Sequence, residues 1–427
     1  MAARARSGPG RRLAACTVAL LALAAPLEGA SAVSPGWTRQ FGTTNVDEAV
    51  AVTVDRAGNT YVAGWTQGVL PSQTSSGMLD AFVRKYDAAG TEVWTRQFGS
   101  SDRDYLRGVV ADSAGDVYLA GETEGTLPGQ VSAGGRDAFL RKYDPSGNEL
   151  WTRQFGGGGG DGGAGVALDA ADNSYIVGTT RGAMPGQTTG GDYDAFIRRY
   201  DPAGNEVWTR QFGGAEGEGA RSIAVGPGGK LLIVGSTQGA FPEQSHTGGF
   251  DAFITQYDVD GNPVWLRQFG TNANDYGVAV AADDHGEITM VGSTDGVLLA
   301  GSAGGVTDAF VRRYDAAGSH RWTNQFGGPY IDAAMTVAMD SLGHAFVGGA
   351  IERSGIGQQG RGQEAFIHCY DSFGREQWTR EFGTDATDMA LGVAVSGRTI
   401  HLVGSTLGSL QGQTSTGGRD AFVLTLG

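Results

Sequence analysis

The stretch Trp94-Thr95-Arg96-Gln97-Phe98-Gly99 decides the fold, because close copies of it return at a fixed spacing along the 427-residue chain. Each copy holds one tryptophan. Successive tryptophans are 57 residues apart in the first five intervals and 56 residues apart in the last. A fixed period of this length indicates one supersecondary unit repeated along the chain. The seven tryptophans are Trp37, Trp94, Trp151, Trp208, Trp265, Trp322 and Trp378.

The first complete unit contains four short stretches with strand character, at residues 49–54, 60–63, 80–86 and 93–98. They are rich in Val, Tyr, Phe and Trp, which favour strands. Two turns of the form Asp-x-x-Gly, at residues 55–58 and 87–90, follow the first and third stretches. In such turns the Asp side chain accepts bonds from backbone N–H groups ahead of it, and Gly adopts positive φ. A long loop, residues 66–79, joins the second and third stretches.

Seven units of four antiparallel strands predict an all-β, seven-bladed β-propeller. The small-residue strand of each unit is expected innermost and the tryptophan strand outermost. We also expect each tryptophan to pack on the turn in its own phrase, as in Asp144 to Trp151.

The ends of the repeat predict how the ring closes. A lone tryptophan strand stands at residues 36–42, and the chain finishes on a third-type strand at 420–426 with no fourth strand after it. The N-terminal strand is therefore predicted to complete the last blade, made of residues 384–427 plus 36–42, and to remove the free edge.

The unit resembles the SBBP β-propeller repeat of bacterial proteins. The resemblance rests on the core Gly58-Asn59-Thr60-Tyr61-Val62-Ala63-Gly64, on the Asp-Ala-Phe strand and on the tryptophan strand, and it extends over most of residues 36–427. It implies a propeller of an exported or cell-surface protein. The family has no settled biochemical activity, so the resemblance supplies no catalytic residues.

The first 32 residues are predicted to be a signal peptide. A basic region containing Arg11 and Arg12 precedes an apolar stretch at residues 13–27, and Ala30-Ser31-Ala32 fits a cleavage site. We therefore expect a propeller domain over residues 33–427, exported to the extracellular space, the cell surface or the periplasm. No transmembrane segment is expected after the signal is removed.

Charge narrows the possible partners. Residues 33–427 carry 27 basic and 45 acidic side chains, a charge of −18. This balance argues against nucleic acid as a partner. Cys369 is the one cysteine of this part, so no disulfide framework is expected. We expect a monomer that requires no cofactor, with Ca²⁺ as the one candidate ion.

The candidate binding residues are seven acids, each six residues after the phenylalanine of the tryptophan strand. As each precedes an innermost strand, we expect them to ring the channel mouth. Carboxylates suit hard cations, so the ring could bind Ca²⁺ or form a recognition rim. The alternative is that each acid bonds the N–H groups of its own loop. The seven are Asp47, Asp104, Asp161, Glu218, Asp275, Asp332 and Asp388.

No catalytic constellation is present in the sequence. There is no H-E-x-x-H or G-x-S-x-G motif and no cysteine pair for zinc. Glycines 156–160 connect two strands, so they lack the helix that a phosphate-binding loop presents. The long-loop face is the expected site, because function on rigid β scaffolds usually resides on loops. In the sixth unit the loop departs from the repeat, and Arg353, Gln358, Gln359 and Arg361 are candidate contacts there.

Two function classes remain open. The first is an exported binding scaffold for a protein or a glycan, without chemistry of its own. The alternative is an extracellular carbohydrate-active enzyme that uses channel-mouth carboxylates such as Asp161 or Glu218. Carboxylates in a deep open cleft would favour the enzyme, and acids bonded to their own loops would favour the scaffold. A purely structural surface element is a third possibility.

Overall fold

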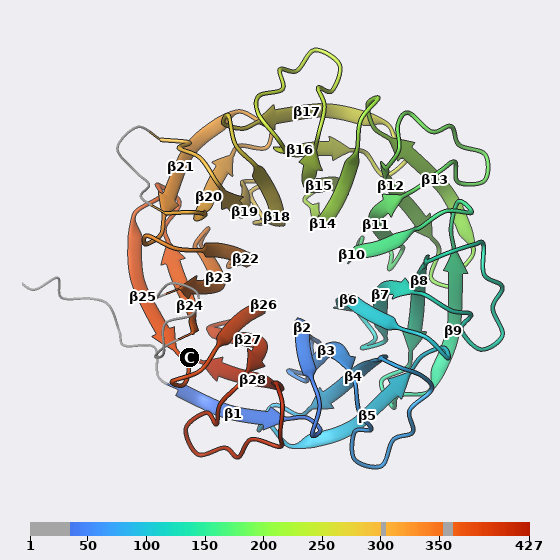
Figure 1. Ribbon diagram of the computed structural model, residues 1–427, viewed down its shortest axis with the longest axis vertical. Helices are drawn as coiled ribbons and strands as arrows, with labels where there is room; N and C mark the ends of the chain where they lie inside the picture. The colour runs from blue at the N-terminus through green and yellow to red at the C-terminus, as the bar shows by residue number, and fades with distance from the viewer. Residues whose placement is uncertain (1–34, 300–304, 353–361) are drawn as a thin grey trace, which may run out of the picture. The chain divides into compact units, whose positions relative to one another are not determined.

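A ring of small sheets surrounds a central opening in the computed structural model (Figure 1). The structure describes residues 35–299, 305–352 and 362–427. Within these ranges there are seven four-stranded antiparallel sheets and no helix. The predicted seven-bladed, all-β propeller is confirmed. We number the blades 1 to 7, starting from the one that contains β2.

The strands occupy four radial positions. The innermost are β2 (Asp47–Val54), β6 (Asp104–Ala111), β10 (Gly162–Leu168), β14 (Glu218–Gly226), β18 (Asp275–Ala282), β22 (Asp332–Met339) and β26 (Asp388–Ser396). The second are β3 (Thr60–Thr66), β7 (Val117–Thr123), β11 (Ser174–Thr180), β15 (Lys230–Thr237), β19 (Ile288–Thr294), β23 (Ala345–Glu352) and β27 (Thr399–Thr406). The third are β4 (Asp80–Tyr86), β8 (Asp137–Tyr143), β12 (Asp194–Tyr200), β16 (Asp251–Tyr257), β20 (Asp308–Tyr314), β24 (Gln363–Tyr370) and β28 (Asp420–Leu426). The outermost are β5 (Glu92–Phe98), β9 (Glu149–Phe155), β13 (Glu206–Phe212), β17 (Pro263–Phe269), β21 (His320–Phe326), β25 (Glu376–Phe382) and β1 (Pro35–Phe41).

The ring closes through β1, as predicted. This strand pairs antiparallel with β28, and Phe41 lies opposite Ala421. The Trp37 N–H donates to Thr425 Oγ1 at 2.9 Å. Phe41 is buried and packs in one apolar cluster with Val403 of blade 7 and residues of blade 1. The first strand therefore supplies both the last ladder of hydrogen bonds and part of the packing that joins the two ends of the ring.

The core lies between neighbouring blades. One apolar cluster joins Tyr61 and Val83 of blade 1 to Leu119 and Phe139 of blade 2, all fully buried. The rings of Phe98 and Phe139 meet edge to face, with their centroids 5.9 Å apart. Burial of such side chains is the main stabilising term here. A single blade could not bury both faces of its sheet, so the blades depend on one another.

Six of the seven repeat tryptophans contact a turn, but the prediction that each uses the turn in its own phrase is wrong. The Trp94 Nε1–H donates to the carbonyl oxygen of Pro145, in blade 2, at 3.0 Å. The ring lies over Gly147 of the same turn, where a Cβ would stand 3.0 Å from Trp94 Cδ2. Trp151 contacts the turn of blade 3 in the same way, through Pro202 and Gly204. The tryptophans therefore join successive blades, a contact that the spacing within one repeat cannot reveal.

The propeller has two unlike faces. On one face, tight turns join the strands, and most of them have the form Asp-x-x-Gly. The Asp55 carboxylate accepts bonds of 2.9 Å from the N–H groups of Ala57 and Asn59, and Gly58 has φ +81°. The other face carries the long loops between the second and third strands and the connections between blades. The long-loop face is therefore the one that carries the long connections, on which the sequence predicts a binding site.

Candidate functional site

The seven candidate acids are buried. Each occupies the first position of an innermost strand, except Asp161, which directly precedes β10. Glu218 has 2% of its surface exposed and the other six have none. The carboxylates are therefore withdrawn from solvent, and their hydrogen bonds decide what they do.

Each acid holds its own loop. The Asp104 carboxylate accepts a bond of 2.6 Å from the Ser100 N–H and a bond of 3.1 Å from Ser100 Oγ. The other six accept a backbone N–H from the residue four positions earlier in the same way. This is the alternative that the sequence left open. The acid fixes the connection between two blades.

A second carboxylate lies beside most of these acids. Gly99 sits between Asp104 of blade 2 and Asp80 of blade 1: a Cβ on this glycine would stand 2.5 Å from Asp104 Oδ2 and 2.6 Å from Asp80 Oδ1. Burial raises the pKa of Asp104, and the neighbouring Asp80 carboxylate raises it further. The same pattern holds for the pKa values of Asp47, Asp161, Glu218 and Asp275, each of which faces an acid of the preceding blade.

These carboxylate pairs do not form the cleft that a glycosidase needs. Asp161 is fully buried beside Asp137, and a Cβ added at Gly156, between them, would stand only 2.3 Å and 2.7 Å from their oxygens. No sugar ring fits where a methyl group does not. Among the described residues, no group of three or more His, Cys, Asp or Glu side chains is arranged to hold a metal ion.

In several blades, a glutamine of the tryptophan strand forms the hydrogen bonds that hold the long loop. The sequence alone did not lead us to predict this role. Gln97 Nε2 donates to the Gly68 carbonyl at 2.8 Å and to Asp80 Oδ2 at 2.7 Å. Its Oε1 accepts the Leu70 N–H at 2.9 Å. Gln40, Gln154, Gln211, Gln268 and Gln325 make the equivalent bonds. One sign of this role is present in the sequence: in the sixth unit, Glu381 replaces the glutamine, and the long loop of that unit departs from the repeat pattern.

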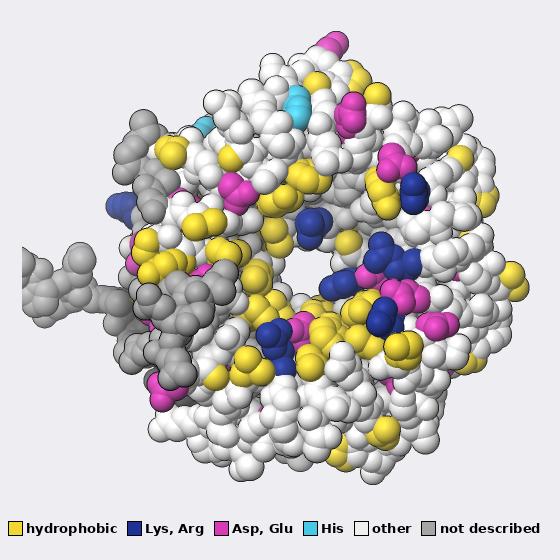
Figure 2. All heavy atoms as spheres, viewed as in Figure 1, with side chains coloured by type: hydrophobic (Ala, Val, Ile, Leu, Met, Phe, Trp, Pro, Cys, Tyr) yellow, Lys and Arg dark blue, Asp and Glu magenta, His cyan; other side chains and the backbone are white. Residues whose placement is uncertain are grey.

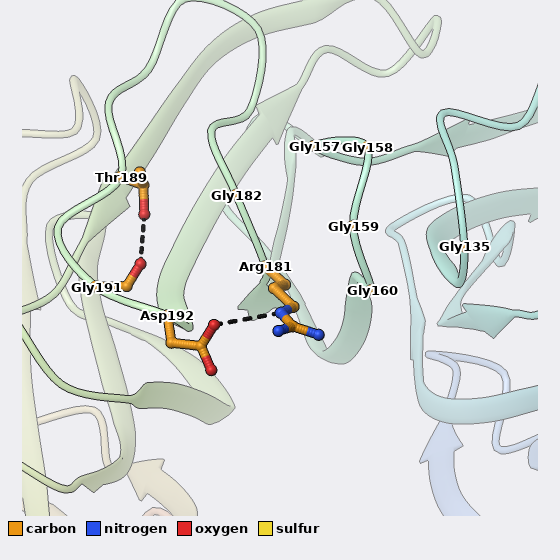
Figure 3. Close-up of a pocket in the computed structure, with 10 residues that line it drawn as sticks. All are labelled: Gly135, Gly157, Gly158, Gly159, Gly160, Arg181, Gly182, Thr189, Gly191 and Asp192. Carbon is orange, nitrogen blue, oxygen red and sulfur yellow. Dashed lines mark hydrogen bonds and ion pairs between the residues drawn. The ribbon is translucent and has the colours of Figure 1, made fainter.

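An open cavity of about 640 Å³ lies on the long-loop face at blade 3 (Figure 3). Arg181 and Asp192 form its charged part and contact each other at 3.3 Å. The Arg181 guanidinium also stacks on Tyr193, 5.6 Å from the ring centroid. The remaining lining is Gly135, glycines 157–160, Gly182, Thr189 and Gly191.

Glycine is required on one side of this cavity and optional on the other. A Cβ on Gly159 would stand 2.1 Å from the Arg181 carbonyl oxygen, so two loops touch there backbone to backbone. A Cβ on Gly160 would meet nothing within 4 Å. In the part of the chain that the structure describes, the N–H groups of residues 158–160 donate to no protein acceptor. The cavity is therefore lined by backbone N–H groups without a protein acceptor and by the Arg181–Asp192 ion pair.

Two predictions concern residues whose placement is not described. The signal peptide at residues 1–32 lies outside the described ranges. So do Arg353, Gln358, Gln359 and Arg361, the candidate contacts of the sixth unit. None of the described residues belongs to a helix of the length and hydrophobicity that crossing a membrane requires.

Fold and loops together define the class of this protein as a seven-bladed β-propeller with a structured long-loop face. Within that class, the family model of the SBBP beta-propeller repeat matches residues 36–71, 93–127 and 150–183. These three stretches are therefore SBBP repeats, and the resemblance seen in the sequence is confirmed there.

Two curated relatives are distant and longer. The regulatory protein FlaEY of Caulobacter vibrioides is 24% identical over 411 residues, which cover 82% of this chain and 43% of that protein. An uncharacterised WD repeat-containing protein, L264, of Acanthamoeba polyphaga mimivirus is 22% identical over 343 residues, covering 60% of this chain and 25% of the relative. The chain thus spans less than half the length of either.

Solved structures agree on the fold. The WD40 propeller domain of Doa1 superposes with a TM-score of 0.53 at 10% identity and covers 92% of this chain and 97% of that one. The WD40 domain of Neurospora crassa Pan2 gives a TM-score of 0.51 at 12% identity, with 89% of each chain covered. At such identities the likeness describes the architecture alone.

Proposed function

We propose that this propeller is a binding scaffold whose long-loop face holds a segment of a partner protein, without catalysis of its own. The observation that carries the proposal is the open cavity on that face. The buried acids and glutamines hold the loops of blade 3 as they hold those of other blades, and blade 3 also has an open cavity beside backbone N–H groups that have no acceptor. Rigid loops around an accessible cavity suit recognition, because little order has to be imposed on binding.

The comparisons support a protein partner. WD40 propellers share the architecture, and the Caulobacter relative has the printed name of a regulatory protein. The burial of the candidate carboxylates weighs against the enzyme alternative, since a general acid must reach its substrate. We further propose that the protein works outside the cytoplasm, on the strength of residues 1–32 alone. Fractionation of cells expressing the chain with and without these residues tests that part.

The cavity can be filled without disturbing the fold. Gly160→Tyr places a side chain in open space, since nothing lies near a Cβ at that position. Val46→Tyr is the matched control, because Val46 holds the same loop position in blade 1. We expect tagged wild-type protein and Val46→Tyr to recover the same partner from the native organism's envelope and medium. Gly160→Tyr should lose it at an unchanged melting temperature. Equal recovery by all three would refute the blade 3 site.

A further inference from the structure

Every innermost strand contains a β-bulge at the same position. In β6, for example, the ladder register shifts between Leu106 and Gly108, so Arg107 has no opposite residue on β7. A bulge re-aims the extra side chain out of the ladder. On an innermost strand, that direction is the central opening. We call the seven bulge residues the collar: Val50, Arg107, Ala164, Arg221, Val278, Met335 and Leu391.

The collar is not symmetric, although the repeat is. Blades 2 and 4 contribute arginines, both exposed, and blade 3 contributes Ala164 between them. The other four members are apolar and half-buried. In Figure 2, most Lys and Arg side chains at the opening lie along the side formed by β6, β10 and β14, with Asp and Glu side chains among them, and hydrophobic side chains border much of the rest.

Glycines bring the two arginine strands close to the strand between them. A Cβ on Gly165 of β10 would stand 3.2 Å from the backbone of Ser222, next to Arg221. A Cβ on Gly108, next to Arg107, would lie 3.3 Å from the backbone of Val166 in β10. The three strands therefore approach backbone to backbone beside the collar, and the bulge residue between the two arginines is the small Ala164.

Arg221 has no partner of its own. Arg107 lies 3.0 Å from Glu122, which also pairs with Arg136. Among the described residues, Arg221 makes neither an ion pair nor a hydrogen bond. Partial desolvation in the opening and the like charge of Arg107 both lower the pKa of Arg221. A guanidinium held beside another cation in a chain of net charge −15 is an unused site for a carboxylate.

We propose that the collar binds an acidic peptide segment of the partner protein, with a carboxylate between Arg107 and Arg221 and apolar side chains against the opposite arc. This inference rests on the scaffold function proposed above. The apolar arc favours a peptide over an acidic glycan, because Val278, Met335 and Leu391 offer nothing to sugar hydroxyls but can pack against leucine-like side chains.

Three labelled probes test the proposal by fluorescence anisotropy: a peptide with the core Glu-Glu-Leu-Leu-Glu-Glu, its counterpart with every Glu replaced by Gln, and an oligogalacturonate. Arg221→Gln removes the unpaired charge and breaks no hydrogen bond or ion pair among the described residues. Arg56→Gln, exposed on the short-turn face, removes the same charge elsewhere and serves as the control. Melting temperatures establish that both variants fold.

We expect the acidic peptide to bind wild type and Arg56→Gln equally and to bind Arg221→Gln about tenfold more weakly. The Gln peptide should bind poorly, and the affinity of the acidic peptide should fall as salt rises. Absence of binding to the acidic peptide, equal affinities for all proteins, or binding of the oligogalacturonate in place of the peptide would overturn the proposal. If Gly160→Tyr still abolishes capture of the partner in those cases, the scaffold function stands and only the collar assignment fails.

Discussion

Replacing Gln97 measures how much its hydrogen bonds to the long loop contribute to stability. Gln97→Ala removes three side-chain hydrogen bonds, of 2.7 to 2.9 Å, to Gly68, Leu70 and Asp80. Leu70 and Asp80 are each 1% exposed, so water cannot easily replace the lost partner. At about 0.5–1.5 kcal/mol for each bond, we expect the free energy of unfolding to fall by about 2–4 kcal/mol.

Gln97→Glu is the sharper variant, because it preserves the shape of the side chain. It replaces the amide donor with a carboxylate at the position 2.7 Å from Asp80 Oδ2. Two carboxylates at that distance repel one another when both are ionised. We expect a larger loss of stability at pH 7 than for Gln97→Ala, and partial recovery near pH 5, where the pair can share a proton.

The assay is the urea midpoint of unfolding, followed by tryptophan fluorescence at both pH values. Gln67→Ala is the control, because Gln67 is an exposed glutamine in the loop that follows β3 and its side chain makes no bond in the structure. It should unfold like wild type. If Gln97→Glu is as stable as wild type at pH 7, or loses the same stability at both pH values, the proposed role of the glutamine is wrong.

Three further outcomes are expected. Deleting residues 35–41 leaves the edge of β28 unpaired. The melting temperature should therefore fall, and size-exclusion chromatography should show self-association. A synthetic peptide of residues 35–41 should reverse both effects, and a monomer with an unchanged melting temperature would contradict closure by β1. Because the pKa of Asp104 is raised above its ordinary value of 3.8, the free energy of unfolding should fall as the pH rises from 3.8 through the raised pKa. Asp104→Asn should therefore make the free energy of unfolding, measured by urea titration, less dependent on pH. Asp104→Ala should lower that free energy by about 1–3 kcal/mol, because the Ser100 N–H then has no acceptor. Equal stability of the two variants would contradict the role of the Ser100–Asp104 hydrogen bond. Trp94→Phe removes the hydrogen bond to the Pro145 carbonyl oxygen and should lower the free energy of unfolding by about 1 kcal/mol in the same assay. Pro145→Ala should not lower it in the same way, because the acceptor is a backbone oxygen that the substitution keeps.

The candidate site was only partly predictable. The sequence places an acid at the same position of every unit, and its periodicity correctly suggested that the acid could serve its own loop. Nothing along the chain showed that the acid of one blade would be buried against Asp80 or its equivalent from the preceding blade. The Arg107 and Arg221 pair was also invisible, since a β-bulge decides which residue of the innermost strand turns towards the opening.

The sequence by itself determined the number of blades, the four strands of each and the closing role of the first strand. These properties are local: period, alternation and turn residues act over distances of a few residues, and an unfilled strand position at one end matches a spare strand at the other. Only the tertiary structure decided what each repeated side chain touches. Trp94, Asp104 and the arginines of the collar all act between blades, and such contacts depend on how curved sheets pack around an axis, which one repeat cannot encode alone.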